Sequence, residues 1–240
     1  MKIVNRNRWQ IAQNVEKDYW DHVSKDPQEF LRILHEKYTF LAKIKSVHPQ
    51  ALDNPEPKGK VLEIGIGALG IGIASLLEPA EKWEIDGVDP MSRKLSVNLP
   101  SHLLGCFTEL MQRLLNYIQI SAEDFDTFQS KYNLVICYNV LDHTINPCQI
   151  IKNIYDLLVP GGYFLLGLDT LSLCSKYRQK IFFRKYFDKA HPYRFTVYGM
   201  RKIIQSMPFE IVWFEKSKTE FIHRFCTKAR RLIAVCRKPE

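Results

Sequence analysis

The chain has 240 residues, of which 46% are hydrophobic and 25% are charged. This length and composition suffice to bury one sizeable core, which excludes a mainly disordered or collagen-like protein. No run approaches the roughly 18 consecutive apolar residues of a membrane span, and the opening MKIVNRNRWQ lacks a signal-peptide pattern. The six cysteines form no C-x-x-C pair and show no metal-ligand spacing, so no metal site is expected. We therefore predict a cytoplasmic protein with reduced thiols.

The formal net charge of +8 is unevenly distributed along the chain. Residues 1–175 hold 17 Lys and Arg against 21 Asp and Glu, whereas residues 176–240 hold 17 against 5. The stretch 173–195 also interleaves basic side chains with aromatic ones. This pattern favours an anionic partner, which could be a phosphorylated small molecule, a nucleic acid or an acidic membrane surface. A solvated basic face explains the charge equally well.

The first 58 residues predict a helical extension. Apolar residues recur at helical spacing from Trp9 to Val23, and Asp26 followed by Pro27 is typical of the start of a second helix, which continues through Ile44. The segment 48–60 contains three prolines and no periodicity, so it is expected to be a linker. We predict a helical cap of residues 1–58 and a main domain of residues 59–240.

After this linker, short buried strands alternate with helices, which predicts a mostly parallel sheet covered on both faces. Asn146 and Pro147 start a well-punctuated helix, and Thr196 caps a later one that runs to Met207. The expected strands are residues 60–64, 83–88, 117–120, 134–138, 163–166, 209–213 and one near 232–235.

The clearest local motif is VLEIGIGALGIG at 61–72, where a strand runs into glycines and then into an expected apolar helix. Gly65 and Gly67 lack a Cβ, so backbone amides there can approach a ligand. Asp89 ends the second strand, where a carboxylate can accept hydrogen bonds from both ribose hydroxyls. Glu63 lies inside the first strand, where its negative charge would repel a pyrophosphate and favour a cationic ligand. S-adenosylmethionine, with its ammonium and sulfonium groups, meets this requirement.

The segments VLEIGIGALG, EIDGVDP, ISAEDF, YNLVICYNVLDHTINP, LLVPGGYFLLGLDT and HPYRFTVYGMRKIIQSMPFEIVWF occur in the order and spacing of one family. Over residues 60–239 the chain resembles the class I S-adenosylmethionine-dependent methyltransferases of the small-molecule-type branch. The resemblance implies a three-layer, Rossmann-like α/β fold with a seven-stranded, mostly parallel sheet and S-adenosylmethionine as cofactor. The cofactor-binding residues that it implies are Glu63, Gly65, Gly67, Gly70, Asp89, Pro90, Met91, Ala122, Glu123, Tyr138 and Asn139.

Two histidines are the candidates for catalysis. His143 follows the fourth strand in NVLDHT, where the acceptor pocket should open, and its ordinary pKa suits proton abstraction. His191 precedes the late helix in AHPYRFT, a loop that often closes the acceptor pocket in relatives. Each could instead only line the pocket or form a turn. We predict methyl transfer to a small molecule, at an oxygen of a sugar or other metabolite. An RNA or ribonucleoprotein methyltransferase is the alternative.

Overall fold

The computed structural model of the chain describes residues 3–53, 58–94, 97–125, 130–171, 190–216 and 229–240. Two helices come first, α1 (Arg6–Val23) and α2 (Pro27–Val47). The strands are β1 (Gly59–Ile64), β2 (Trp83–Val88), β3 (Leu114–Ile118), β4 (Tyr132–Tyr138), β5 (Leu158–Leu171), β6 (Glu210–Lys216) and β7 (Ala229–Arg237). The remaining α-helices are α3 (Ser101–Gln112), α4 (Pro147–Leu157) and α6 (Val197–Ile204). Within the described ranges, no helix combines the length and apolar content that a membrane crossing requires.

The seven strands form one sheet in the order β3-β2-β1-β4-β5-β7-β6. All pairs from β3 to β5 are parallel, whereas β7 runs antiparallel to both β5 and β6. The chain moves outward from β1 to β3 and then returns to the other side of β1 to form β4. In such sheets a ligand binds outside the carboxyl ends of the strands where the order reverses, which here is between β1 and β4. The predicted mostly parallel seven-stranded sheet is confirmed.

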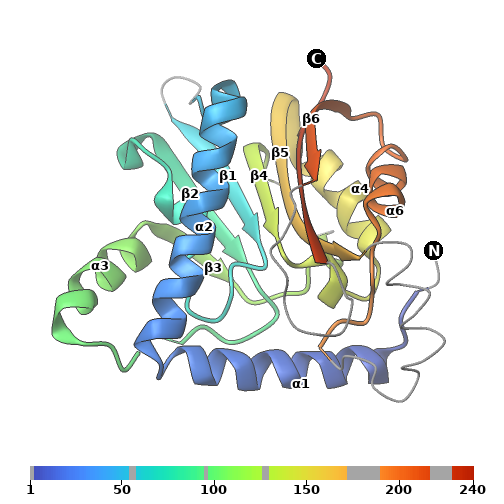
Figure 1. Cartoon of the computed structure of the whole chain (residues 1–240). Helices are drawn as coiled ribbons and strands as arrows, with labels where there is room; N and C mark the ends of the chain where they lie inside the picture. Colours follow the sequence, from blue (N-terminus) through green and yellow to red (C-terminus); the bar gives the residue numbers. More distant parts are fainter. Residues whose placement is uncertain (1–2, 54–57, 95–96, 126–129, 172–189, 217–228) are drawn as a thin grey trace.

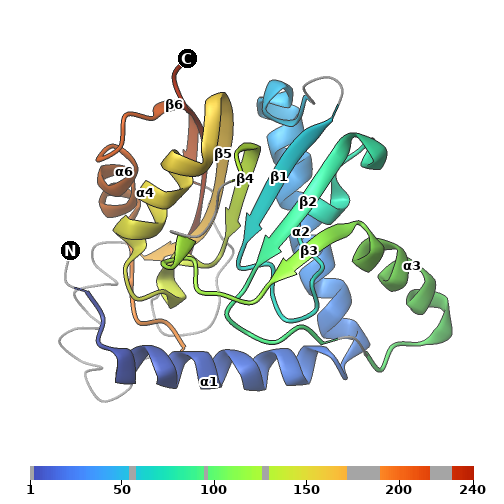
Figure 2. The same cartoon turned by 180° about the vertical axis from the view of Figure 1, so that it is seen from behind.

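Successive side chains of the strands point to opposite faces of the sheet and belong to two separate apolar clusters. Leu62 of β1 belongs to the cluster covered by α4 and α6, with Ile154 and Met200 in its core. Its neighbour Val61 belongs to the other cluster, where α2 contributes Phe40. Figure 1 shows α2 in front of the sheet, and Figure 2 shows α4 and α6 on the opposite face. The three predicted layers are therefore present.

The two N-terminal helices begin at capping side chains. Asn5 accepts a hydrogen bond from the amide of Arg8 at the start of α1, and Asp26 accepts one from the amide of Gln28 at the start of α2. Because α2 packs on the sheet, the chain turns sharply before it, and α1 runs across the carboxyl ends of the parallel strands (Figure 1). This position places α1 over the switch point of the sheet.

Two expectations about local structure are wrong. No α-helix follows the glycines among residues 65–82, where the structure has only two 3₁₀ turns, Ala74–Leu76 and Ala80–Lys82. Further glycines and Pro79 interrupt the apolar run, and α2 supplies the helix on that face of the sheet. The third strand lies at Leu114–Ile118 instead of residues 117–120, because α3 ends at Gln112 and leads directly into it.

Candidate functional site

The glycines after β1 form a tight loop around the end of β2. Gly65, Gly67 and Gly70 have φ angles of 69°, 85° and 66°, which an L-residue with a side chain rarely adopts. The amide of Gly65 donates to the carbonyl of Val88 at 2.7 Å. This hydrogen bond turns the loop back across the carboxyl ends of β1 and β2.

Neighbouring side chains also explain why glycine is needed here. A Cβ on Gly67 would lie 2.5 Å from the indole of Trp20, which reaches the loop from α1. A Cβ on Gly65 would collide with Val140 in the same way. The sequence analysis explained the missing Cβ atoms of Gly65 and Gly67 by the approach of a ligand alone. In the structure, side chains of the protein itself occupy part of the space beside these glycines.

Asp89 lies at the carboxyl end of β2 with its carboxylate 3% exposed. Its two oxygens accept hydrogen bonds of 2.9 Å from the amides of Gly67 and Met91. Burial raises the pKa of Asp89 to about 6, although these two amides favour the charged form. The carboxylate therefore joins the glycine loop to β2 and lines the space beside both.

Glu63 is only 1% exposed and does not line that space. Its Oε2 accepts a hydrogen bond of 2.7 Å from the amide of Ala74, on the segment that follows the glycine loop. Burial raises the pKa of Glu63, and the charge of Lys37 and backbone donors oppose that shift. The observed contact of Glu63 is thus with the chain after the loop, and its predicted role toward an ammonium group stays a prediction.

Lys37 is a residue of the site that the sequence analysis missed. It extends from α2, is buried, and donates hydrogen bonds to the carbonyls of Ile66 and Ile71. Burial lowers its pKa, while the charges of Glu63 and Asp89 oppose that shift. The sequence feature that could have revealed Lys37 is its position on the apolar stripe of α2, seven residues after Phe30 and seven before Ile44. A lysine at that position has to be buried.

A cavity of about 500 Å³ opens between α1, α2 and the carboxyl ends of the parallel strands. Its size is that of a site for a small molecule. Of the predicted site residues, it brings together Gly65, Gly67, Asp89, Pro90, Met91, Ala122, Glu123, Tyr138, Asn139, His143 and His191. Glu63 and Gly70 lie outside its lining.

Asn139, which follows β4, adopts a left-handed conformation with φ at 57°. Asparagine tolerates this geometry better than most residues, and such positions often occur at functional sites. Its amide donates to the carbonyl of Gly167 at 2.7 Å, whereas its buried Oδ1 has no hydrogen-bond partner among the described residues. Because Asn139 lines the cavity, this oxygen is placed to accept a hydrogen bond from a ligand.

Glu123 already has partners at the far end of the predicted cofactor position. Its Oε1 accepts hydrogen bonds from the amides of Ile145 at 2.7 Å and Asn146 at 3.1 Å. Its other oxygen accepts one from the hydroxyl of Ser121. These contacts fix the loop that precedes α4, so the carboxylate shapes the cavity wall there.

The two candidate histidines meet in the lining of the cavity, near the loop that Glu123 fixes. The rings of His143 and His191 have centroids 4.4 Å apart. The Nδ1 of His143 lies 3.2 Å from a carboxylate oxygen of Glu16 on α1, and the carboxylate of the buried Asp142 approaches the Nε2 atoms of both imidazoles. The structure thus joins residues from three distant segments into one cluster.

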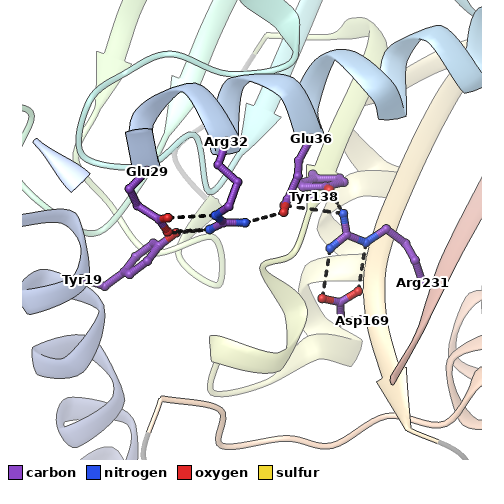
Figure 3. A network of polar contacts seen from close by, with 7 residues as sticks. All are labelled: Tyr19, Glu29, Arg32, Glu36, Tyr138, Asp169 and Arg231. Atoms are coloured by element: carbon purple, nitrogen blue, oxygen red, sulfur yellow. Dashed lines mark hydrogen bonds and ion pairs between the residues drawn. The ribbon is translucent and has the colours of Figure 1, made fainter. Parts of the chain in front are cut away.

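A chain of polar contacts along one cavity wall was also missed by the sequence analysis. Arg231 of β7 forms two hydrogen bonds, of 2.9 and 3.0 Å, with the carboxylate of Asp169 of β5. It also contacts Tyr138 and Glu36, and Arg32 then continues the chain along α2. Figure 3 shows the whole network, which consists of Tyr19, Glu29, Arg32, Glu36, Tyr138, Asp169 and Arg231. It connects α1 and α2 with three strands.

A parallel sheet with a cavity at its switch point, a glycine loop after β1 and a carboxylate after β2 defines an α/β protein of the nucleoside-binding class. The model of the methyltransferase domain family matches residues 19–213, and the chain belongs to that family. The resemblance to class I S-adenosylmethionine-dependent methyltransferases is thereby confirmed. The match begins within α1, ahead of the predicted domain boundary at residue 58.

Among curated relatives, ubiquinone biosynthesis O-methyltransferase of Leptothrix cholodnii is 31% identical over 109 residues, which are 45% of this chain and 43% of that protein. The enzyme of the same name from Vibrio vulnificus is 26% identical over 150 residues, 62% of this chain and 53% of that one. The chain thus spans about half the length of the curated relatives that it matches.

Solved structures show the same fold at low identity. The N-methyltransferase NodS from Bradyrhizobium japonicum, in complex with S-adenosyl-L-homocysteine, has a TM-score of 0.58 at 16% identity, covering 98% of this chain and 100% of that one. The magnesium protoporphyrin IX methyltransferase of Synechocystis, also with S-adenosylhomocysteine, has a TM-score of 0.59 at 17% identity, covering 93% and 94%. Similarity at this level shows the fold alone.

Proposed function

We propose that this protein transfers the methyl group of S-adenosylmethionine to a hydroxyl oxygen of a small molecule, such as a sugar or another metabolite. The observation that carries the proposal is one cavity whose lining brings together the glycine loop, Asp89, His143 and His191. S-adenosylmethionine would supply the methyl group as part of a sulfonium. The names of the curated relatives, which are O-methyltransferases, support oxygen as the acceptor atom.

The residues of the cavity fit a cationic nucleoside. Its described lining holds five carboxylates against three basic side chains, so the balance favours a positively charged ligand. The carboxylate of Asp89 would accept hydrogen bonds from the ribose hydroxyls, and the unpartnered Oδ1 of Asn139 would accept one from the methionyl part. The backbone of Gly65 and Gly67 would lie against the same part of the ligand.

The chain itself has to align the acceptor oxygen with the methyl carbon and to dispose of one proton. The bond between carbon and sulfur breaks as the bond between carbon and oxygen forms, and the products are S-adenosylhomocysteine and a methyl ether. The hydroxyl proton leaves toward the cluster of His143 and His191, which lies at the acceptor end of the cavity. Helix α1 supplies Trp9 and Glu16 to the lining and runs across the carboxyl ends of the strands, so it would lie over the bound ligands.

The cavity wall favours an uncharged or cationic acceptor. The guanidinium groups of Arg32 and Arg231 are each paired with carboxylates, and the network of Figure 3 holds three carboxylates against two arginines. Neither arginine therefore supports the anionic acceptor suggested by the basic C-terminal quarter. Most of the basic aromatic stretch 173–195 lies outside the described residues, and no observation supports a nucleic acid partner.

Methyl transfer can be tested with radiolabelled S-adenosylmethionine and a cell extract depleted of its own methyltransferases and separated by size. We expect the full chain to move the label into the small-molecule fraction and the ¹³C NMR shift of the methyl group to identify an O-methyl product. His143→Gln should slow the transfer by about 100-fold, as loss of proton transfer does in other enzymes. Label in the RNA or protein fraction, or a methyl group on nitrogen, would contradict the assignment.

Cofactor binding should weaken on acidification because of Asp89. Its pKa is raised to about 6, and Glu16 of α1 adds to this shift whereas Lys37 of α2 opposes it. Since the hydroxyls of a ribose donate to the ionised carboxylate, affinity should be constant above pH 7 and about tenfold lower at pH 5. Calorimetric titration with S-adenosylhomocysteine measures this profile. Asp89→Asn should bind weakly and show a flatter profile; an identical profile in that variant would assign the titration to another group.

A further inference from the structure

The histidine cluster at the acceptor end has the composition of a metal site. Asp142 and His143 belong to the 3₁₀ turn after β4 (Leu141–His143), and His191 lies on the segment before α6. The two oxygens of Asp142 are 3.7 Å from Nε2 of His143 and 3.6 Å from Nε2 of His191. One ligand atom from each residue lies within 4.8 Å of the others. Two imidazoles and one carboxylate are a frequent ligand set for divalent transition metals.

The carboxylate of Asp142 provides independent evidence of a ligand. Its side chain is 5% exposed, and its buried Oδ1 has no hydrogen-bond partner among the described residues. A buried carboxylate is costly unless a cation or hydrogen-bond donors compensate it. Asp142 faces the two imidazole nitrogens, so a cation held between the three side chains would supply this compensation.

Glu16 orients the first histidine for metal binding. Its Oε1 lies 3.2 Å from Nδ1 of His143, which is ion-pair distance without hydrogen-bond geometry, since the buried Nδ1 has no hydrogen-bond partner among the described residues. With a metal bound, this carboxylate would accept the proton of Nδ1. Nε2 then keeps its lone pair, on the side of Asp142 and His191. A carboxylate behind the distal nitrogen of a ligating histidine is the usual outer partner in zinc sites.

Backbone contacts fix the two segments relative to each other. The carbonyl of Asp142 accepts a hydrogen bond of 3.1 Å from the amide of Tyr193, and the hydroxyl of Tyr193 donates to the carbonyl of Ile145 at 2.6 Å. The carbonyl of His191 also accepts a hydrogen bond from the guanidinium of Arg8 on α1. The two segments that carry the ligands are therefore held next to each other before any ion binds.

We propose that Asp142, His143 and His191 bind a divalent transition metal ion, with Zn²⁺ as the representative. Donors around tetrahedral zinc are about 3.3 Å apart. One ligand atom from each residue lies within 4.8 Å of the others, so the side chains would rotate to bring them closer when an ion binds. Both histidines line the cavity whereas Asp142 lies behind them, which leaves the open coordination position toward the acceptor. The role of the ion rests on the proposed function: when it is bound, the metal would lower the pKa of an acceptor hydroxyl, and the hydroxyl proton would leave to water in place of transfer to the two imidazoles.

Direct titration of the full chain with Zn²⁺, after removal of metals with a chelator and dialysis, tests the site. We expect one ion per chain, a rise in the unfolding temperature on addition of Zn²⁺, and visible absorption bands when Co²⁺ is used instead. Asp142→Asn and His191→Gln should each weaken Zn²⁺ binding at least tenfold. Glu16→Gln should weaken it about 10- to 100-fold, because it removes the charge that positions His143.

His102→Gln is the matched control, because His102 is exposed on α3 and its loss should leave Zn²⁺ binding unchanged. Circular dichroism of each variant verifies that it folds. Equal binding by the native chain, Asp142→Asn and His191→Gln would overturn the site, as would the absence of stoichiometric binding.

Titration of the same samples with S-adenosylhomocysteine separates the two proposals. The nucleoside binds at Asp89, so its affinity should not depend on Zn²⁺. A chain that binds this nucleoside but no zinc would refute the metal site and leave the methyltransferase function standing. A chain that binds zinc but not the nucleoside would refute the proposed methyltransferase function and leave the metal site standing.

Discussion

Asp89→Ala is expected to weaken S-adenosylhomocysteine binding by about 100- to 10,000-fold. The variant loses two hydrogen bonds between ribose hydroxyls and a charged acceptor, each worth about 1.5–3 kcal/mol. The amides of Gly67 and Met91 lose their acceptor, so the variant should be less stable than the native chain but still folded. Isothermal titration calorimetry measures the affinity, and a thermal unfolding curve verifies the fold.

Asp86→Ala is the matched control for this variant. Asp86 lies on the same strand, and its carboxylate accepts hydrogen bonds from Tyr132 and Asn116 outside the cavity. Its removal should change stability but leave nucleoside affinity within about twofold, the scale of surface effects on distant sites. Equal affinities for the native chain and Asp89→Ala would show that the ribose carboxylate has been misassigned.

Gly67→Ala is expected to destabilise the protein by about 2–4 kcal/mol and to reduce nucleoside binding. The φ angle of 85° costs a side chain about 1–2 kcal/mol, and the contact with Trp20 adds an overpacking cost of about 1–3 kcal/mol. Urea unfolding monitored by circular dichroism gives the change in free energy. Gly105→Ala should instead stabilise by up to about 1 kcal/mol, because it lies in α3 with open space around it.

A double-mutant cycle with Trp20→Ala separates the two costs. Since the added methyl of Gly67→Ala meets the indole, the effects of the two changes should not be additive, and the combined variant should recover the overpacking part. The cost of the φ angle should remain. Strict additivity would mean that α1 does not lie on the glycine loop in solution.

The sequence alone determined the features that depend on neighbouring residues. The glycines after β1, Asp89 after β2 and the start of α4 at Asn146 and Pro147 all lie where the pattern predicts them. Each feature follows from local chemistry: positive φ angles need glycine, asparagine caps a helix and buried parallel strands are continuously apolar. Because parallel strands end at one edge of the sheet, the order of motifs was also enough to choose site residues most of which line the cavity.

Only the tertiary structure decided which distant side chains meet. Lys37 beneath the glycine loop, Glu16 beside His143 and the pairing of Arg231 with Asp169 join segments that are far apart along the chain. The replacement of the expected helix after the glycine loop by α2, on that face of the sheet, is another contact between distant segments. Contacts of this kind arise from the geometry of the whole sheet and its covering helices, so a local pattern of residues does not predict them.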